Sequence, residues 1–472
     1  MKFTSTRSNT ENDSLSTILR GLAPDGGLFL PLEIPARKAF GAGGPDLSTL
    51  EAAERFALSS VFDDIPSDVI EAAVANLLSK FPAGDPIPLV DAGPFKILEL
   101  FHGPTGAFKD VALSVLPVLM SAAAKREGAG KVLVLTATSG DTGSAAMAGF
   151  SNVPGVEVAV FFPNTGTSRV QRLQMTTPSA PNVHGIAIRG NFDDAQAAVK
   201  RIFSDNAFRA EAAAKGVTLS SANSINTGRL VPQIAYYLLA ASRLGGAQFD
   251  VVVPSGNFGN ILAAYYAKLM GAPIRRFVCA SNVNDVLARF IATGVYDPGD
   301  KFTVTNSPSM DIRKSSNVER ILWLLNGGLE DPAAASAETK RLMDNFAANG
   351  KYELSPAAKE RLFAQFTGGV ATPDETEAEM RQMRAESRYI LDPHTAVATC
   401  VARKLGFPKD GVPCVVAATA TPYKFPETCL RAFGENVLYS LPPAFAALES
   451  APITQTKVVD IEGIDDAVRA CF

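Results

Sequence analysis

Three polar segments of the sequence carry the side chains best suited to chemistry. The first is TATSGDTGS, residues 136–144, which follows an apolar run and precedes an alanine-rich helical pattern. Its glycines let backbone amides approach an anion, and the hydroxyls of Thr138, Ser139 and Thr142 add donors at the positive end of a helix. A helix cap by Asp141 or Thr142 is the alternative, but a cap needs only one such residue. The segment therefore favours anion binding.

The second segment is PSGNFGN, residues 254–260, which directly follows the apolar run DVVV. Gly256 and Gly259 keep side chains away, so that successive N–H groups can converge on a dianionic phosphate. Taken alone, an ordinary strand-to-helix turn explains the loop equally well. The sequence contains neither GxGxxG nor GxxxxGKS/T, which weakens dinucleotide and nucleoside-triphosphate interpretations. A monophosphate fits this loop better.

The third segment is FHGPTGAFKD, residues 101–110, a turn that leads into a helical pattern with Lys109 at its start. A lysine that is partly desolvated near a helix N-terminus can lose its proton and act as nucleophile and base. Most lysines are solvated at the surface, so this segment alone would not indicate catalysis. Together with the two anion-binding loops, it makes Lys109 the candidate catalytic residue.

Between residues 131 and 419, short β-branched runs alternate repeatedly with helical patterns. Such alternation predicts parallel strands joined by crossover helices, and open α/β sheets bind ligands at the carboxyl ends of their strands. Several runs are nearly continuous in apolar residues, as strands covered on both faces require. The clearest strand candidates are residues 131–135, 156–162, 183–188, 250–253, 276–280 and 412–417.

Two other regions differ from this alternation. Residues 1–95 begin turn-rich and then show helical segments at 50–58 and 68–78, which indicates a separate N-terminal region. Between about 306 and 389, Glu, Ala, Arg and Lys recur at helical spacing and strand patterns vanish. We interpret this stretch as a helical insertion in the larger α/β domain. The length of 472 residues agrees with about three units of roughly 150 residues.

Composition argues against several classes of protein. The formal charge of −4, with scattered basic residues, argues against nucleic-acid binding, which needs a basic face. No apolar stretch reaches the ~18 residues of a membrane span and the N-terminus has no signal-peptide core, so we expect a cytoplasmic protein without membrane contact. The five cysteines form no CxxC pattern, so we expect reduced thiols and no metal site.

The segment around Lys109 is similar to a known motif. HGPTGAFKD resembles the lysine motif of threonine synthases, which belong to the fold-type II pyridoxal-phosphate (PLP) enzymes related to tryptophan synthase β. Further blocks resemble the same family, in the family's order, from about residue 3 to 430. These blocks are GLAPDGGLFLP, ATSGDTGSAA, NSINTGRLVPQ, PSGNFGN, SPSMDI, SSNVER, LDPHTA and ATATPYKF.

The resemblance implies an α/β fold of the fold-type II, tryptophan synthase β-like kind. Two parallel-sheet α/β domains are expected beside the N-terminal region and the helical insertion. The small α/β domain would span residues 131–244, and the large PLP-binding domain would combine 96–130 with 245–472.

For the cofactor, pyridoxal 5′-phosphate, the resemblance implies that Lys109 binds it covalently and shuttles protons. Thr419 would offer the pyridine nitrogen a neutral hydroxyl, and Asp141 would lie near the phenolic oxygen, where related enzymes carry asparagine. A carboxylate there would repel an oxyanion unless one of the two is protonated. The cofactor phosphate would be held by Gly256, Asn257, Phe258 and Asn260.

The resemblance also assigns a second anion site, for the substrate phosphate, to the block NSINTGR. An arginine fork suits phosphate oxygens, and short polar side chains add donors. The substrate-binding residues implied are Asn223, Ser224 and Arg229, with Ser139 and Thr142. Lys424 either completes the phosphate site or is a solvated surface lysine. Thr421 departs from the family, which usually has histidine there.

The two histidines near these motifs have open roles. His102 is either a neighbour of Lys109 or a packed side chain bonded to backbone, and His394 is expected to cap or position a helix.

The implied reaction converts O-phosphohomoserine and water to threonine and phosphate, by γ-elimination followed by β-addition, with Lys109 moving the protons. A serine/threonine dehydratase or a phospho-amino-acid lyase is the nearest alternative, but a dehydratase needs no second phosphate site. A noncatalytic PLP-binding protein would be distinguished by an inert Lys109. A sugar-phosphate or nucleotide-binding module is more distant. The oligomeric state is open between monomer and homodimer.

Overall fold

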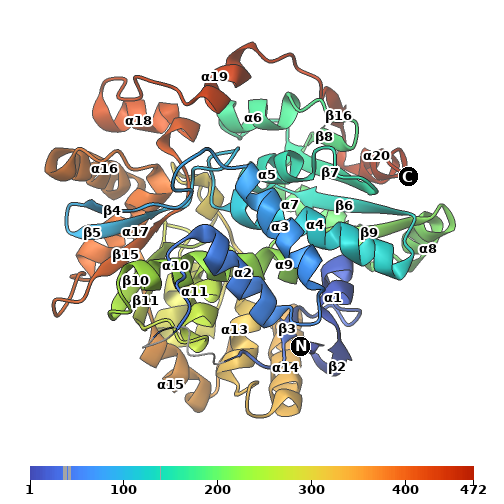
Figure 1. Ribbon diagram of the computed structural model, residues 1–472, viewed down its shortest axis with the longest axis horizontal. Coiled ribbons are helices and arrows are strands. Elements are labelled where there is room, and N and C mark those ends of the chain that lie inside the picture. The colour runs from blue at the N-terminus through green and yellow to red at the C-terminus, as the bar shows by residue number, and fades with distance from the viewer. Residues whose placement is uncertain (36–39, 41–43, 139) are drawn as a thin grey trace.

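The computed structural model describes residues 1–35, 40, 44–138 and 140–472. Figure 1 shows a large sheet on the left of the molecule and a small sheet on the right. Both are built from buried strands whose alternate side chains enter different cores. Among the helices of the described ranges, none is long and apolar enough to cross a membrane.

The large sheet has the order β14-β11-β10-β15-β5-β4. All neighbouring strands are parallel except β4 and β5, which form an antiparallel hairpin. Val251 and Val253 pack on the side of α10 and α11, whereas Val252 packs on the side of α16 and α17. The strands are β14 (Phe366–Val370), β11 (Ile274–Ser281), β10 (Phe249–Pro254), β15 (Cys414–Ala418), β5 (Phe95–Glu99) and β4 (Leu89–Ala92).

The small sheet is parallel throughout, with the order β16-β8-β7-β6-β9. Leu133 and Leu135 point into a core shared with α7, and Val132 and Val134 into a core shared with α5. All six strand candidates of the sequence are confirmed across the two sheets. The strands are β16 (Lys457–Val459), β8 (Val183–Ile188), β7 (Val156–Pro163), β6 (Lys131–Ala137) and β9 (Val217–Ser221).

The N-terminal region contains the two expected helices, α2 (Leu50–Val61) and α3 (Ser67–Ser79). It also forms a three-stranded antiparallel sheet that the sequence patterns did not predict, because its strands are very short. That sheet consists of β1 (Phe3–Ser5), β2 (Ser8–Asn12) and β3 (Phe29–Pro31), and α1 (Ser14–Arg20) follows it.

The expectation that residues 306–389 contain no strand is wrong. The segment FTGGV forms β14, the edge strand that pairs with β11. A Cβ at Gly368 would lie 2.8 Å from the Ala288 Cα, and one at Gly369 would lie 2.5 Å from the Val401 side chain. Glycine is therefore needed at these two positions so that helices can approach both faces of the strand. Because glycines replace apolar side chains there, the sequence lacks the apolar pattern typical of a strand. The helices around it are α13 (Val318–Leu325), α14 (Pro332–Asn349), α15 (Pro356–Gln365) and α16 (Pro373–Ser387).

The prediction that the large domain extends to residue 472 is also wrong for the last segment of the chain. Strand β16 pairs with β8, and α20 (Ile464–Arg469) buries Ile464 and Val468 in the core of the small sheet. Residues 457–469 therefore complete the small domain, although they follow the large domain in sequence. The other proposed boundaries stay predictions.

The remaining elements connect the two sheets or cover them. They are α4 (Lys109–Glu127), α5 (Asp141–Phe150), α6 (Arg169–Thr176), α7 (Phe192–Ser204), α8 (Asn206–Ala214), α9 (Thr227–Leu230), η1 (Val231–Ile234), α10 (Ala235–Arg243), α11 (Gly259–Leu269), α12 (Val286–Thr293), β12 (Val295–Tyr296), η2 (Pro308–Met310), β13 (Tyr352–Glu353), α17 (Pro393–Lys404), η3 (Pro422–Lys424), α18 (Pro426–Phe433), α19 (Pro443–Ser450) and η4 (Ile461–Gly463).

Candidate active site

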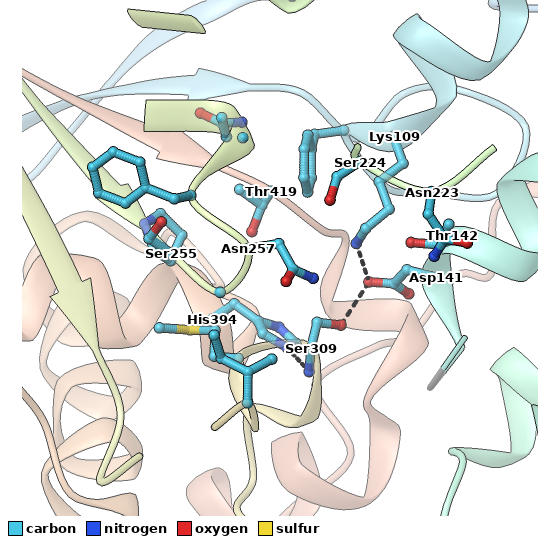
Figure 2. A pocket seen from close by; sticks show the side chains of 18 of the residues that line it. Lys109, Asp141, Thr142, Asn223, Ser224, Ser255, Asn257, Ser309, His394 and Thr419 are labelled. Atoms are coloured by element: carbon cyan, nitrogen blue, oxygen red, sulfur yellow. Dashed lines mark hydrogen bonds and ion pairs between the residues drawn. The ribbon is translucent and has the colours of Figure 1, made fainter. Parts of the chain in front are cut away.

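A cavity lies where the carboxyl ends of β6, β10 and β15 meet, at the position that open α/β sheets use for ligands (Figure 2). It collects most of the residues that the sequence singled out, from both sheets. Those that line it are Lys109, Asp141, Thr142, Asn223, Ser224, Arg229, Gly256, Asn257, Phe258, Asn260 and Thr419. Ser139 falls outside the described residues, and Lys424 is not among the described residues that line the cavity.

Lys109 is presented by a turn that its neighbour Asp110 closes. The Asp110 carboxylate accepts hydrogen bonds from the amide of Thr105 at 2.9 Å and from its hydroxyl at 2.6 Å. The Phe108 amide donates to the Thr419 carbonyl at 2.9 Å, which holds the start of α4 against the end of β15. The chain therefore places Lys109 beside Thr419 without using either side chain.

Lys109 is almost enclosed, and its Nζ donates to Oδ2 of Asp141 at 3.2 Å (Figure 2). Burial lowers the pKa of Lys109, Asp141 opposes this shift, and the nearby cations Lys424 and Arg229 reinforce it. The net effect is a lowered pKa of Lys109. An uncharged amine, which can act as base and nucleophile, is therefore easier to form here than in water.

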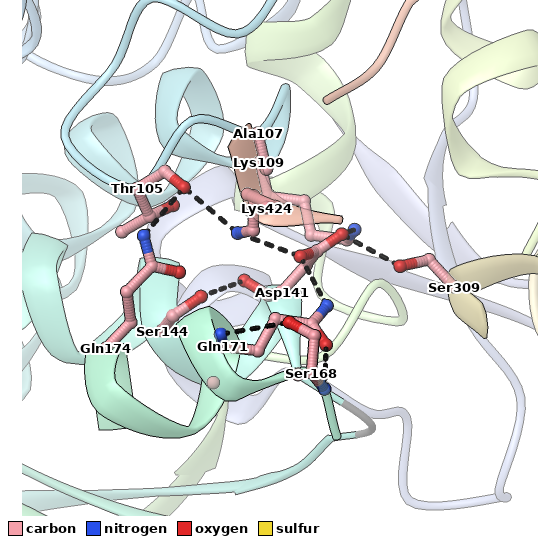
Figure 3. A network of polar contacts seen from close by, with 12 residues as sticks. Thr105, Ala107, Lys109, Asp141, Ser144, Ser168, Gln171, Gln174, Ser309 and Lys424 are labelled. Atoms are coloured by element: carbon pink, nitrogen blue, oxygen red, sulfur yellow. Dashed lines mark hydrogen bonds and ion pairs between the residues drawn. The ribbon is translucent and has the colours of Figure 1, made fainter. Parts of the chain in front are cut away.

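Asp141 is the centre of a network of four donors (Figure 3). Its Oδ1 accepts from Lys424 Nζ at 2.8 Å and from Gln171 Nε2 at 2.9 Å, and its Oδ2 accepts from Ser309 Oγ at 2.8 Å in addition to Lys109. Burial alone would raise the pKa of Asp141, but the charges of Lys109 and Lys424 hold it well below its usual range. Asp141 is therefore ionised.

Lys424 is not a solvated surface lysine, so that alternative is wrong. Its side chain is 0% exposed, and besides Asp141 its Nζ donates to the Thr105 carbonyl at 2.9 Å. Sequence patterns could not place this side chain because both of its partners are distant along the chain.

The loop 254–260 lies at the N-terminus of α11, whose positive end favours an anion. Phe258 caps the helix with a φ of +60°, and a Cβ on Gly256 would lie only 2.9 Å from the Ser309 carbonyl. The Ser315 hydroxyl donates to the Gly256 carbonyl at 2.8 Å, and the Asn317 amide donates to the Asn257 carbonyl at 3.1 Å. Because these two carbonyl groups accept hydrogen bonds from residues outside the loop, the amide groups at the start of the helix can donate to a ligand.

The side chain of Asn260 is already occupied. Its Nδ2 donates to the Tyr236 hydroxyl at 3.0 Å, and its Oδ1 accepts from the Tyr237 hydroxyl. Asn260 can therefore contribute its backbone amide to the loop, while its side chain ties the helix start to α10.

Arg229 is a second group in the cavity that suits an anion, and the residue is only 2% exposed. One nitrogen donates to the Ala222 carbonyl at 2.5 Å, but Nε has no hydrogen-bond partner among the described residues, and no carboxylate of those residues pairs with the group. Burial lowers its pKa to about 10, so it is still cationic at neutral pH. A buried cation without a counterion is a costly arrangement that a bound anion would relieve.

Comparison with known proteins identifies the family. A model described as "Pyridoxal-phosphate dependent enzyme" matches residues 95–364, "Threonine synthase N terminus" matches 2–76, and "Threonine synthase, C-terminal" matches 395–468. The threonine synthase of Schizosaccharomyces pombe is 37% identical and covers 100% of this chain and 95% of its own length. That of Pseudomonas aeruginosa is 38% identical, over 92% of this chain and 90% of its own. The chain belongs to the threonine synthase family.

Solved structures of threonine synthases agree. The PLP-bound enzyme from Brucella melitensis has a TM-score of 0.89 and 35% identity, over 100% of this chain and 99% of that chain. The yeast enzyme has a TM-score of 0.90 and 32% identity, over 100% and 98%. The predicted family resemblance and the α/β fold-type II class are confirmed.

The cavity fits the cofactor of threonine synthases on its own chemistry. A lysine with lowered pKa, a glycine loop in which Gly256 has no room for a side chain, and a hydroxyl at Thr419 match an aldehyde, a phosphate and a pyridine nitrogen. The Nε of Arg229 has no partner among the described residues, which leaves a cationic donor for an anion other than the cofactor phosphate.

Ser309 and His394 also line the cavity, and neither was assigned to it from the sequence. The Ser309 amide donates to His394 Nε2 at 3.1 Å, and His394 Nδ1 lies 2.9 Å from Asp392. This pattern fits the neutral tautomer with the proton on Nδ1. Asp392, rather than His394, caps α17, and His394 instead supports the serine that bonds to Asp141. Their occurrence in the blocks SPSMDI and LDPHTA was the available signal.

His102 lies outside this group. Its Nε2 contacts Glu99 at 2.7 Å, and it does not belong to the described residues that line the cavity.

Proposed function

We propose that the chain converts O-phosphohomoserine and water to threonine and phosphate, with pyridoxal phosphate bound at Lys109. The observation that carries this proposal is that Lys109 shares one cavity with the glycine loop 254–260 and with Arg229, whose charge has no counterion among the described residues. A phosphorylated amino acid brings a second phosphate beside that of the cofactor, whereas unphosphorylated serine does not.

The cofactor is held by groups at the ends of β10 and β15. The amides of Gly256, Asn257, Phe258 and Asn260 receive its phosphate at the positive end of α11. Thr419 offers the pyridine nitrogen a hydroxyl, which does not require that nitrogen to be protonated. When bound, pyridoxal phosphate accepts the charge that is left when a proton is removed from the substrate.

Lys109 moves the protons of the reaction. In its uncharged form it removes a proton from the α-carbon, gives that proton up and, uncharged again, removes one from the β-carbon of the substrate, whose γ-phosphate departs. The oxygen of a water molecule then forms a bond to the β-carbon while the water gives up a proton. Protons return to the α- and γ-carbons, and the one that remains leaves with phosphate. The lowered pKa of Lys109 supports this role because the free amine is the reactive form.

The substrate phosphate is held at Arg229. Its guanidinium is fixed by the Ala222 carbonyl and has Nε free for an anion. Asn223, Ser224 and Thr142 line the same cavity and add polar groups, and Ser139 is proposed with them from the sequence. Negative charge grows on the leaving phosphate, so Arg229 stabilises the step in which that bond breaks.

The dehydratase alternative and a noncatalytic role are both disfavoured by the family to which the chain belongs. The cytoplasmic location and the monomeric or homodimeric state stay predictions.

The direct test measures two products in parallel. The purified protein with pyridoxal phosphate is incubated with O-phosphohomoserine, and threonine and phosphate are each quantified over time. We expect equal amounts of both, and little turnover of unphosphorylated serine. Equal rates on the two substrates, or phosphate release without threonine, would contradict the proposal.

A further inference from the structure

The site contains a second buried lysine, Lys424, whose contacts differ from those of Lys109. Its Nζ lies 2.8 Å from Asp141 Oδ1 and 2.9 Å from the Thr105 carbonyl, and the side chain is 0% exposed (Figure 3). Whereas Lys109 faces the cavity, Lys424 does not belong to the described residues that line it. The two lysines therefore bind opposite oxygens of one carboxylate, and only one of them faces the substrate.

The backbone holds the two lysines in a fixed relation. The Phe108 amide donates to the Thr419 carbonyl at 2.9 Å, and the Thr421 amide donates to the Gly106 carbonyl at 3.0 Å. A Cβ at Gly106, which has a φ of +70°, would lie 2.6 Å from the Thr421 methyl group. The turn before Lys109 and the segment before Lys424 thus pack directly on one another, so neither lysine can move far from Asp141.

Other charged groups surround this arrangement, but none replaces Asp141. Asp110 approaches Lys424, yet burial raises its pKa and its oxygens accept hydrogen bonds from Thr105. On the cationic side, Arg229 acts on Lys109. His394 accepts a hydrogen bond from the Ser309 amide in its neutral tautomer and therefore adds no cation.

One further carboxyl group borders the cavity. Burial raises the pKa of Asp311, which accepts hydrogen bonds from Thr305, Asn282 and Asn284. Among the described residues, Asp141 is the only carboxylate that forms an ion pair with either lysine.

We propose that Lys424 is the permanent counter-cation of Asp141, and that this second cation lets Lys109 give up its own charge while Asp141 stays ionised. The inference rests on the proposed role of Lys109, and it makes Lys424 a positioning residue that acts through Asp141. It departs from the expectation that Lys424 binds the substrate phosphate.

The physical reason is the state of Asp141 after Lys109 becomes neutral. A buried carboxylate without a cationic partner is strongly unfavourable, so Asp141 alone would either keep Lys109 protonated or take up a proton itself. With Lys424 bound to its other oxygen, the carboxylate keeps an ion pair through both states of Lys109. The positive charge of Lys424 also disfavours a second positive charge nearby.

The test compares charge with hydrogen bonding at position 424. In the holoenzyme, the visible absorbance is titrated with pH, because its midpoint reports protonation at the Lys109 nitrogen. Lys424→Met should raise this midpoint by about 1 to 2 pH units, as expected for the loss of a nearby charge at an effective dielectric constant near 20. Lys424→Gln keeps donors but not charge and should shift it similarly, whereas Lys424→Arg should stay near the wild-type value.

Asp141→Asn provides a change of opposite sign. Removing the anion leaves Lys424 to repel a proton on Lys109, so the midpoint should fall. The double variant Asp141→Asn with Lys424→Met should lie between the two single variants, since each removes one member of an interacting pair. Lys268→Gln is the matched control, because Lys268 is a partly buried lysine that bonds to Gln365 and does not line the cavity.

Two outcomes would overturn the inference. The first is a wild-type midpoint in Lys424→Gln together with a raised KM for O-phosphohomoserine, which would place Lys424 on the substrate phosphate. The second is a shift in Lys424→Arg as large as that in Lys424→Met, which would indicate packing rather than charge. Absence of threonine formation by the wild-type protein would contradict the proposed function, but the midpoints would still test this inference because they need no turnover.

Discussion

Two buried carboxyl groups in different parts of the molecule show opposite behaviour. Asp141 lies in the active site and accepts hydrogen bonds from four side chains, two of them lysines. Glu54 lies on α2 in the core, is 0% exposed, and neither of its oxygens has a hydrogen-bond partner among the described residues. The pKa of Asp141 is held well below its usual range, whereas burial raises that of Glu54 well above it.

The difference shows that burial alone does not decide the state of an acidic side chain. Both groups lose their water, which favours the neutral form. At Asp141, donors converge from α4, α6, η2 and η3, and the charges of the two lysines among them reverse the effect. At Glu54 no donor is present among the described residues, so the neutral acid is retained in an apolar core. Each prediction below tests one side of this comparison.

The largest expected effect follows from removing the reactive lysine. Lys109→Gln should abolish covalent attachment of pyridoxal phosphate and lower turnover by at least about 10³-fold, because proton transfer by the lysine is lost. Borohydride reduction followed by peptide mapping should find the cofactor on Lys109 in the wild type and on no lysine in the variant. Modification of another lysine in the wild type would contradict the assignment.

Removing the carboxylate should destabilise the fold. Asp141→Ala leaves two lysines, of which Lys424 is fully buried, without their anion, and breaking a buried pair in this way costs about 3 to 5 kcal/mol of unfolding free energy. Denaturant unfolding of the cofactor-free protein measures this loss of unfolding free energy. The matched control is Glu54→Ala, where no ion pair is broken. A smaller loss at Asp141 than at Glu54 would remove the contrast between the two sites.

A moderate effect is expected at the uncompensated cation. Arg229→Lys keeps the charge but loses the planar fork, and should lower kcat/KM for O-phosphohomoserine by a factor that corresponds to about 1 to 3 kcal/mol. The affinity for pyridoxal phosphate, measured by fluorescence, should change little because we propose that the cofactor phosphate binds at the loop 254–260 and not at Arg229. An equal loss of cofactor affinity would show that the two sites are not separate.

The smallest expected effect concerns the core acid and depends on pH. The pKa of Glu54 in the folded state lies above its unfolded value of 4.5, so its contribution to stability is fully present below pH 4.5 and is lost as pH rises through the folded pKa. Glu54→Gln removes this penalty and should stabilise the protein by on the order of 1 to 2 kcal/mol near pH 8 and by little near pH 4.

Denaturant unfolding at several pH values measures this effect. A gain that does not depend on pH would show that Glu54 is not the titrating group. Turnover should be the same in Glu54→Gln and wild type, since Glu54 is outside the cavity.

Much of the site could be predicted from local sequence patterns. The buried strands are continuous apolar runs, and parallel strands place the loops that follow them at one edge, which brought the loops 136–144 and 254–260 together. Lys109 became a candidate through its place at the start of a helix together with the two glycine-rich loops, and the family blocks added further lining residues, although neither Ser309 nor His394 was assigned to the cavity. The family and the reaction class were therefore determined by the sequence alone.

Tertiary structure decided the features that join distant segments. Strand β14 is hidden in the sequence because its glycines serve contacts with two helices, and β16 joins a domain that is far away along the chain. The contacts of Lys424 with Asp141 and Thr105 and of His394 with Ser309 likewise depend on packing between elements. A side-chain type shows what a residue can do, but its charge state and partner depend on which groups the fold brings within hydrogen-bonding distance in a site without water.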